Sequence, residues 1–579
     1  MPDFLPAGGG ADEGGAQGPD VSYRTGGHML AGALKDHGVD TIFTLCGGHI
    51  LPLLDGCLDA GIRVIDHRHE GAAALAAEGW ALATGEVGFA AVTAGPGFAN
   101  AVIGLVDAGS WSVPLVLCAG HTGLAMTGRG AVQDADQMAI ASVVAKRSLV
   151  CLETGRVEEL AADALYQARA GRPGPVYLEM PQDVLAGKGP AGSPLHGHPA
   201  VPPTPAGAPE DVERALGLLQ GADKPVILAG GGAFWSGAGE SLLRLAEVAG
   251  IPVTTTSAAR GIVPDSHELC LGTMVHGGGA VLGADVVLVL GSEFNANVSM
   301  GRQPLFDDGQ TVIQVDIRPE GIGGNRRPDH AVVGDVKRVL DALADGWSGS
   351  ARDREAWLGE ATDLTAWVKS TWDDQVEAHR GSRIHPGAAA RATVEWARSR
   401  LGPGVSFVAD GGDALAWGLA YMYAEGPGRL LNTTTALGTL GVGVPFALAA
   451  QAARPDERTV LFVGDGAFGL SAMEFDTAVR HGLPVICVVS NNYGWRDVSF
   501  EQDAWFGAGR HVASELADSR YDLFAEAFGG HGEHVSEPDE LEPALDRCLE
   551  SGTASIVNVE TDPTVLSDLL KNLGAMGIQ

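Results

Sequence analysis

Short apolar runs rich in Val, Ile, Leu and Phe alternate with alanine-rich amphipathic stretches along most of this chain. In the first part of the sequence we expect strands at 41–47, 61–70, 88–97 and 114–120. Most of these runs end in glycine, and apolar residues at helical spacing follow them. This pattern is typical of βα units with parallel strands. The sequence therefore predicts an α/β fold built from open, doubly wound parallel sheets.

The pattern recurs in three blocks, which we interpret as three doubly wound parallel-sheet domains in series. The first domain is expected at 21–188, the central domain at 209–350 and the third domain at 384–562. A Pro- and Gly-rich stretch at 187–208 and a polar, Trp-bearing stretch at 350–383 are expected to connect them. A length of 579 residues agrees with three to four units, since a single core does not grow to this size.

Both ends of the chain lie outside these blocks. Residues 1–20 are rich in Gly, Pro and acidic residues and are expected to form a disordered lead-in. Residues 563–579 continue past the last expected strand with an amphipathic helical pattern. A lid over the site and a helix packed on its own domain both fit this tail.

Composition excludes several classes of protein. The 38 basic and 72 acidic residues give a formal net charge of −34, which disfavours nucleic acid and anionic membranes as partners. A stretch of about 18 uncharged apolar residues is absent, so a membrane span is not expected. The first residues lack the pattern of a secretory signal. Seven singly placed cysteines favour a reducing cytoplasm over a disulfide framework or a zinc site.

The strongest chemical signal is the run GDG, followed after some two dozen residues by NN, at 464–492. An apolar strand precedes GDG, a helix is expected at 467–481, and the next strand ends at the asparagines. Asp465 and Asn492 should therefore lie at the carboxyl ends of neighbouring parallel strands, where such sheets bind ligands. Gly464 and Gly466 would let the backbone and a helix N-terminus approach phosphate. One carboxylate, one amide and one backbone carbonyl suit Mg²⁺, whereas an ordinary βα turn with an Asn-rich loop is the alternative.

This run resembles the motif of the thiamine-diphosphate-dependent decarboxylase and lyase superfamily, and the resemblance covers nearly the whole chain. The family's order is a pyrimidine-binding, a central and a diphosphate-binding domain. The resemblance implies thiamine diphosphate and Mg²⁺ as cofactors, with Asp465, Asn492 and the main-chain oxygen of Gly494 as metal ligands. It also implies an obligate homodimer with sites shared between chains, and a homotetramer is expected from pairing of dimers.

Glu70, in the run DHRHEGAAALAAEGWA, matches the glutamate that the family needs in its first domain. It follows an expected strand and opens an expected helix. An acid that touches the aminopyrimidine ring favours the imino tautomer, which then removes the proton from the thiazolium carbon. A carboxyl buried against an apolar ring can share a proton at neutral pH because its pKa is raised. The alternative is an acidic residue that is simply favoured in a first helical turn.

Further residues match the family's cleft by resemblance alone. Gly438 would accept a hydrogen bond from the aminopyrimidine, and Leu440 would support the bent cofactor. The remaining cofactor- and substrate-facing positions are Gly47, Gly48, Gly95, Gly97, Gly464, Gly466 and Ala467. The candidates for proton transfer near the thiazolium are Gln133, His49, Tyr493 and Trp495. His49 fits a packed turn residue equally well, and the two aromatics fit packing positions.

Three local features bear on the branch of the superfamily. The runs LCGGHILPLLDG, RHE and RGAVQDADQ look most like 2-hydroxyacyl-CoA lyases and acetolactate-synthase-like lyases. The stretch after NN lacks the Leu-Gly-Met-Val run of acetolactate synthases. The His-His pair and later Glu of simple pyruvate decarboxylases are absent too.

The resemblance therefore implies an enzyme that cleaves a 2-hydroxyacyl-CoA to an aldehyde or ketone and formyl-CoA. The alternative is a FAD-containing, acetolactate-synthase-like decarboxylase and carboligase that uses pyruvate. A silent nucleotide-binding homologue is a third hypothesis, which the intact Glu70, Asp465 and Asn492 oppose. The glycines at 230–232 would serve the ADP moiety of CoA or FAD in the central domain.

Overall fold

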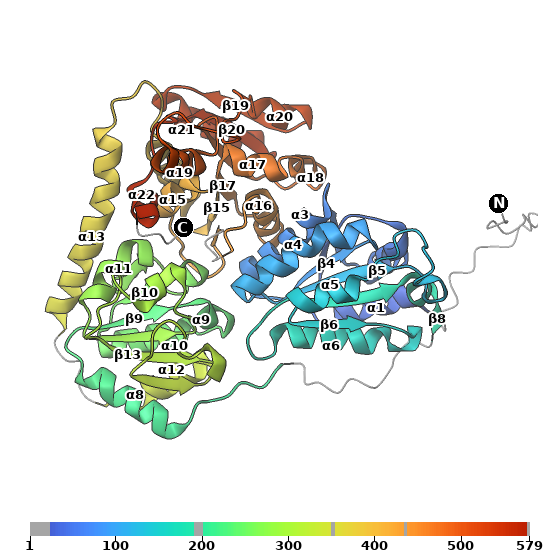
Figure 1. Ribbon diagram of the computed structural model, residues 1–579, viewed down its shortest axis with the longest axis horizontal. Coiled ribbons are helices and arrows are strands. Elements are labelled where there is room, and N and C mark those ends of the chain that lie inside the picture. The colour runs from blue at the N-terminus through green and yellow to red at the C-terminus, as the bar shows by residue number, and fades with distance from the viewer. Residues whose placement is uncertain (1–23, 190–200, 349–353, 433–436, 576–579) are drawn as a thin grey trace, which may run out of the picture.

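A computed structural model describes residues 24–189, 201–348, 354–432 and 437–575, and the expected lead-in at 1–20 lies outside these ranges. Each third of the chain forms a six-stranded sheet with helices packed around it (Figure 1). The neighbouring strands of all three sheets are parallel. The prediction of three α/β domains with parallel sheets is thus confirmed.

The first domain has the strand order β3-β2-β4-β5-β7-β6. Its strands are β2 (Thr41–Thr44), β3 (Arg63–Asp66), β4 (Gly88–Val92), β5 (Leu115–His121), β6 (Arg147–Val150) and β7 (Val176–Pro181). Its helices are α1 (Gly26–Asp36), α2 (Leu51–Ala60), α3 (Glu70–Thr84), α4 (Pro96–Trp111), α5 (Gln137–Val144), α6 (Val157–Arg169) and α7 (Gln182–Ala186), with the short 3-10 helix η1 (Gly48–Ile50). The antiparallel pair β1 (Arg24–Thr25) and β8 (Lys188–Gly189) joins the two ends of this domain.

The central domain has the strand order β11-β10-β9-β12-β13-β14. Its strands are β9 (Pro225–Ala229), β10 (Val253–Thr255), β11 (Cys270–Thr273), β12 (Val286–Leu290), β13 (Thr311–Asp316) and β14 (His330–Val333). Its helices are α8 (Pro209–Gly221), α9 (Gly231–Trp235), α10 (Gly239–Ala249), α11 (Met274–Gly283) and α12 (Val336–Asp345).

The third domain has the strand order β16-β15-β17-β18-β20-β19. Its strands are β15 (Ser406–Asp410), β16 (Leu430–Asn432), β17 (Thr459–Gly464), β18 (Ile486–Asn491), β19 (His531–Val535) and β20 (Ser555–Glu560). Its helices are α14 (Pro386–Arg400), α15 (Asp413–Tyr421), α16 (Gly443–Ala453), α17 (Asp465–Ser471), α18 (Glu474–Arg480), α19 (Arg496–Phe506), α20 (Asp522–Ala527), α21 (Leu541–Ser551) and α22 (Asp568–Ala575).

One expectation about secondary structure is wrong in part, and one expected connector proves to be helical. The connector expected at 350–383 contains the long helix α13 (Glu355–Ala378), which packs against α11 and runs from the central to the third domain (Figure 1). Its buried residues recur at helical spacing: Trp357, Ala361, Thr365, Trp372 and Val376. The single helix expected at 467–481 is divided into α17 and α18.

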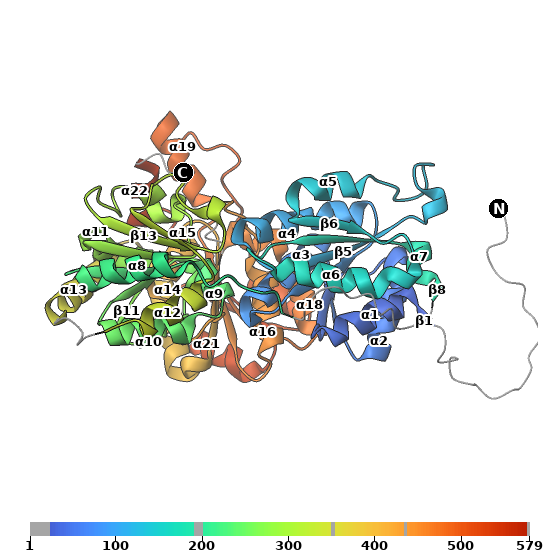
Figure 2. The same cartoon turned by 90° about the horizontal axis from the view of Figure 1, so that it is seen from below.

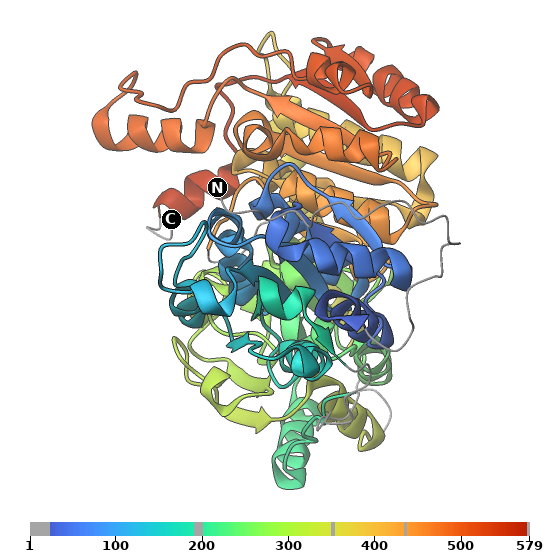
Figure 3. The same ribbon diagram turned by 90° about the vertical axis from the view of Figure 1, so that its right-hand side faces the viewer.

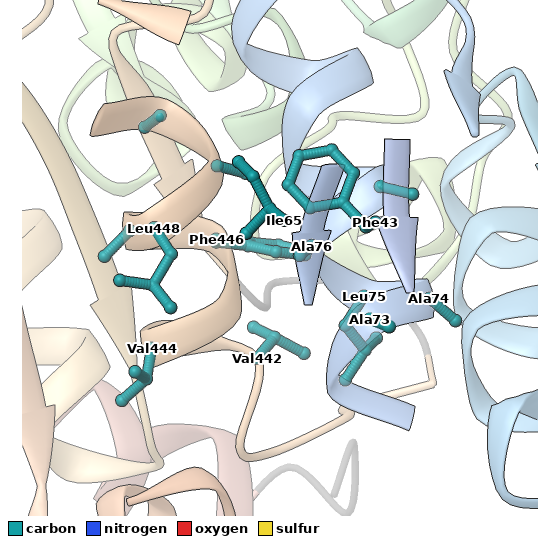
Figure 4. Packing of buried hydrophobic residues seen from close by; sticks show 14 of the residues in the cluster. Phe43, Ile65, Ala73, Ala74, Leu75, Ala76, Val442, Val444, Phe446 and Leu448 are labelled. Atoms are coloured by element: carbon teal, nitrogen blue, oxygen red, sulfur yellow. The ribbon is translucent and has the colours of Figure 1, made fainter. Parts of the chain in front are cut away.

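The first and third domains share a hydrophobic core in which α3 lies against α16 (Figure 4). The alanine-rich sequence of α3 permits this close approach, since a side chain at Gly79 would collide with Phe446. Polar contacts extend the interface: a buried pair with His67 Nδ1 2.9 Å from Glu474 Oε2, and an exposed ion pair between Arg480 and Asp66. These contacts hold the two domains in one arrangement within the chain.

The carboxyl ends of the first and third sheets face the same side of the molecule. The helices α5 and α19 follow strands of these sheets and lie on the same, upper side in Figure 2, α5 over the first domain and α19 over the third. Figure 3 shows α19 standing out from the third domain, with α22 next to it. Leu569 and Leu570 of α22 pack against the third-domain core, and Ser567 N donates to Asp413 Oδ1 at 2.8 Å. These contacts fit the alternative of a helix packed on its own domain. A lid over the site stays a prediction.

No helix in the described ranges is long and apolar enough to cross a membrane.

Candidate active site

Asp465 and Asn492 lie side by side at the carboxyl edge of the third sheet, as expected. The strands β17 and β18 pair in register, and Asp465 begins the helix that follows β17. Its carboxylate accepts hydrogen bonds from the backbone N–H of Gly466 and of Gly494, both at 3.0 Å. Burial raises the pKa of Asp465 to about 6, because these two donors compensate only part of the lost hydration.

Three oxygen atoms meet at this point. The side-chain oxygen of Asn492 faces only acceptors, with the carbonyl oxygen of Gly494 at 3.0 Å and Oδ1 of Asp465 at 3.2 Å. These contacts become favourable if the side-chain amide of Asn492 is flipped so that its nitrogen donates to both oxygens, or if a cation lies among the three oxygens. Octahedral Mg²⁺ ligands at about 2.1 Å from the ion lie about 3 Å from one another, so the spacing fits such an ion. The donor set of one carboxylate, one amide and one carbonyl suits a hard cation.

The two aromatic residues after Asn492 have packing partners. The indole of Trp495 covers Gly466, where a Cβ would lie 2.8 Å from the ring. The ring of Tyr493, whose φ is +62°, lies under the guanidinium of Arg383 at 4.3 Å from the ring centroid. These contacts agree with the packing alternative, and nothing in the geometry adds to the predicted proton-transfer role.

The loop that carries Gly438 and Leu440 is held from two domains. Within the third domain, Asp410 Oδ2 accepts the backbone N–H groups of Gly441 and Gly443 at 3.0 and 2.8 Å. From the first domain, Asp107 Oδ1 on α4 accepts the hydroxyl of Thr439 at 2.7 Å. Gly438 and Gly441 have φ of +67° and +82°, which glycine adopts without strain.

The two carboxylates that hold this loop are both buried. Burial raises the pKa of Asp107 to about 6, with the hydrogen bond from Thr439 opposing the shift. Burial also raises the pKa of Asp410 to about 6. Glu78 on α3 lies beside Asp107 and has its pKa raised well above the ordinary value by burial and by that neighbour. The hydrogen bond from Thr439 to Asp107 is thus made in a buried, acidic environment.

A second group of predicted residues lies at the carboxyl edge of the first sheet. Glu70 begins α3, is 9 % exposed, and accepts a hydrogen bond from Asn100 Nδ2 at 3.0 Å. Gly97 lies at the same place, since a Cβ there would be 3.5 Å from Glu70 Oε1. Sequence reasoning missed Asn100, which is on the next helix and contacts Glu70 only in the folded chain.

His49 and Gln133 are joined to this group through Thr93, which follows β4. Thr93 Oγ1 lies 3.0 Å from His49 Nδ1 and donates to Gln133 Oε1 at 3.4 Å. Gly47 packs on Thr93, where a Cβ would lie 2.4 Å from the threonine Cβ, whereas Gly48 faces open space. Burial, with a further effect from His121, lowers the pKa of His49.

The turn at Gly95 is fixed by a buried polar network. Its N–H donates to Gln137 Oε1 at 2.6 Å, and Gln137 Nε2 donates to Tyr177 Oη at 2.8 Å. Gly95 has φ +60°, and a Cβ there would lie 2.9 Å from that of Gln133. The network thus holds the turn against which Gln133 lies.

The two groups do not meet within one chain. Both groups contact helix α4. Glu70 lies near Gly97 at its start, and the loop that carries Gly438 contacts Asp107 further along it. Ten residues of helix separate these contact points, which corresponds to about 15 Å. This separation is larger than a single aminopyrimidine ring.

A large cavity lies at the carboxyl ends of the central strands, between the central and first domains. Its volume is about 700 Å³. Gly231 and Gly232, within the predicted glycine run, line one wall. Basic side chains from both domains also line it: Arg169, Arg172, Lys337 and Arg338.

Three family models match the chain in the order of its domains. The match over residues 24–140 is described as "Thiamine pyrophosphate enzyme, N-terminal TPP binding domain". The central domain of the same enzymes matches residues 212–343, and the C-terminal TPP binding domain matches residues 410–559.

Relatives of two kinds match over nearly their full length. "Acetolactate synthase large subunit IlvG" of Mycobacterium tuberculosis is 36% identical, over 94% of this chain and 97% of that protein. "2-hydroxyacyl-CoA lyase 2" of Bos taurus is 33% identical, over 93% and 90%. The E. coli protein "Acetolactate synthase isozyme 3 large subunit" is 32% identical, over 91% and 92%. The chain therefore belongs to the thiamine-pyrophosphate enzyme family, in the part that contains acetolactate synthases and 2-hydroxyacyl-CoA lyases.

Thr439→Val should weaken binding of thiamine diphosphate about tenfold. The change removes the donor to the buried Asp107 carboxylate, and hydrogen bonds to charged groups contribute about 1.5–3 kcal/mol. Titration of the apoprotein with thiamine diphosphate in saturating Mg²⁺, followed by tryptophan fluorescence, measures the affinity. Thr439→Ser keeps the hydroxyl and is the matched control. Equal affinity in the valine and serine variants would show that the Asp107 contact does not hold the loop.

Proposed function

We propose that this protein is a thiamine-diphosphate- and Mg²⁺-dependent lyase that cleaves a 2-hydroxyacyl-CoA to an aldehyde or ketone and formyl-CoA. The observation that carries the proposal is the placement of a histidine, His49, which is joined through Thr93 to the group around Glu70. A substrate with a 2-hydroxyl group needs a base for that proton before the carbon–carbon bond can break. Decarboxylation of a 2-oxo acid needs no such base, so a histidine at this place favours the hydroxy substrate.

The cofactor would be held by the third-domain residues. Asp465, Asn492 and the Gly494 carbonyl would bind Mg²⁺, and Gly464, Gly466 and Ala467 at the start of α17 would face the diphosphate. Bound thiamine diphosphate supplies a nucleophilic carbon and an acceptor for the electron pair of the broken bond. Glu70 would hold a proton at the aminopyrimidine ring, with Asn100 fixing the carboxyl. The Gly438 carbonyl would accept the amino group of the same ring, and Leu440 would support the bend.

Each complete site would use Glu70 of one chain and Asp465 of its partner, because the two groups stay apart within a chain. The faces that would meet in such a dimer carry exposed apolar residues. Val143 on α5 is 84% exposed and Trp505 on α19 is 72% exposed, on the side that both helices share (Figure 2). In the proposed dimer these side chains would be covered by the partner. A two-fold axis would then give two equal sites per homodimer.

The central cavity would bind the ADP moiety of the acyl-CoA. Its volume suits a nucleotide. To bind phosphate groups, Arg169, Arg172 and Lys337 would exchange their ion pairs with Glu86, Glu293 and Asp341, which also line the cavity. The same cavity would suit FAD. This is the second candidate, an acetolactate-synthase-like decarboxylase and carboligase that uses pyruvate. The sequence identity to acetolactate synthases favours this second candidate. A purified protein that is yellow because it contains bound flavin would support it.

A substrate panel distinguishes the two candidates. Pure protein with thiamine diphosphate and Mg²⁺ would be incubated with 2-hydroxyacyl-CoAs of several chain lengths, and separately with pyruvate. Mass spectrometry would score formyl-CoA and acetolactate. The proposal predicts formyl-CoA from at least one acyl-CoA, and none without thiamine diphosphate. Acetolactate from pyruvate with no formyl-CoA from the panel would replace it by the second candidate.

A further inference from the structure

The side chain of Thr93 is closely packed between two glycines. It is 8% exposed, and its Cβ and Cγ2 atoms fill the space beside Gly47 and Gly97, where added Cβ atoms would lie 2.4 and 2.7 Å from them. This packing points its hydroxyl at two polar atoms, His49 Nδ1 at 3.0 Å and Gln133 Oε1 at 3.4 Å. A side chain locked in this way acts on its neighbours in a fixed direction.

The donors available at Thr93, His49 and Gln133 indicate which group donates in each of the two hydrogen bonds. A threonine hydroxyl has one proton, and the amide oxygen of Gln133 can only accept. The hydroxyl proton of Thr93 therefore goes to Gln133, and the threonine oxygen accepts from His49 Nδ1–H. A neutral His49 then carries its proton on Nδ1, and Nε2 keeps a free lone pair.

Gln133 is itself held in a costly conformation. Its φ of +64° is uncommon for a residue other than glycine, and it lies against Gly95. The Gly95 turn is tied to Gln137, so the backbone under Gln133 cannot relax. Strained backbone that its surroundings enforce is concentrated at functional sites.

Other groups around His49 keep the ring neutral. Its Cβ packs on Gly120 of β5, and the nearby ring of His121 faces the backbone oxygens of Thr122 and Ala135, both at 3.1 Å. Burial and the neighbouring His121 both lower the pKa of His49. Near neutral pH the ring therefore stays uncharged, and Thr93 is the hydrogen-bond partner of its Nδ1.

We propose that Thr93 is a positioning residue that holds His49 in the Nδ1–H tautomer, so that Nε2 can take the proton of the substrate's 2-hydroxyl group. The substrate in this inference rests on the proposed function. The tautomer of His49 does not depend on that function. In the reaction the O–H bond breaks and the proton moves to Nε2. The electron pair left on oxygen forms the carbonyl of the departing aldehyde or ketone as the carbon–carbon bond breaks, and the pair of that bond stays with the one-carbon fragment. The one-carbon fragment needs one proton before it leaves as formyl-CoA, so the imidazolium returns it and the cycle balances.

Two variants of Thr93 separate the hydroxyl from the packing. Thr93→Val keeps the shape and removes the hydroxyl, whereas Thr93→Ser keeps the hydroxyl and removes one methyl group. With the best acyl-CoA of the panel, we expect the valine variant to lose kcat about 30-fold with KM changed less than about threefold. The serine variant should restore kcat to within about fivefold of the native chain. Equal kcat in the native chain and the valine variant would overturn the proposal.

Nitrogen NMR tests the tautomer without any substrate. In protein labelled with ¹⁵N-histidine, the His49 signals are identified by their loss in His49→Gln. The native chain and Thr93→Ser should show the Nδ1–H pattern, and Thr93→Val should lose it. An Nε2–H pattern in the native chain would overturn the proposal whatever the kinetics. The Nδ1–H pattern in a native chain that forms no formyl-CoA would support the role of Thr93 and contradict the proposed function. Thr93→Ala replaces the valine variant if the latter does not fold.

Discussion

Asp465→Ala is expected to abolish binding of thiamine diphosphate at concentrations that saturate the native chain. The change removes the one carboxylate among the three oxygen donors, and with it the acceptor for the N–H groups of Gly466 and Gly494. Replacing a residue that only hydrogen-bonds to a metal ligand already weakens metal affinity about 10- to 100-fold. Loss of a ligand should therefore cost more than about 100-fold. Isothermal titration with thiamine diphosphate in excess Mg²⁺ measures the effect.

The matched control for this variant is Asp456→Ala, an exposed aspartate of the same domain. It should bind the cofactor like the native chain. The fold of both variants is checked by circular dichroism, because Asp465 also caps backbone groups. Tight binding of the cofactor by a folded Asp465→Ala protein would contradict the metal assignment.

Glu70→Gln should bind the cofactor with native affinity and turn over about 10²- to 10⁴-fold more slowly. The amide fills the same space and can still contact Asn100, but it cannot hold an exchangeable carboxyl proton at the aminopyrimidine. Positioned acid–base groups contribute rate factors of this size. Exchange of the thiazolium proton for deuterium, followed by NMR after quenching, should slow in parallel.

Glu153→Gln, an exposed glutamate of the same domain, is the control and should leave exchange unchanged. If Glu70→Gln exchanges the thiazolium proton at the native rate, the carboxyl does not activate the cofactor.

The parts of the site that lie close in sequence, or at the ends of neighbouring strands, could be predicted. Asp465 and Asn492 are examples, because parallel strands bring their carboxyl ends to one edge. The apolar pattern likewise predicts the three sheets. The helix α13 was missed as a helix because its polar faces and tryptophans also fit a connector.

Residues that act across the fold could not be predicted in this way. Asp107 meets Thr439 only after the first and third domains pack, and nothing in the sequence near either residue marks the pair. Asn100 and Thr93 become part of the site through contacts with Glu70 and His49 on other elements. Such roles depend on tertiary packing, which periodicity and motif spacing do not contain.

The central claim is that each site combines the Glu70 group of one chain with the Asp465 group of another. The most direct measurement is the activity of mixed dimers made by co-expressing differently tagged Glu70→Gln and Asp465→Ala chains. Each parent homodimer should be nearly inactive. In a mixed dimer one site receives both lesions, and the other receives an intact Glu70 and an intact Asp465.

Random mixing would make half of the dimers mixed, with one intact site in each, so about a quarter of native activity should return. Purification through both tags isolates the mixed dimer, which should have about half of native activity. If the doubly purified dimer is as inactive as its parents, the two groups are not combined across chains, and the account of the site is wrong.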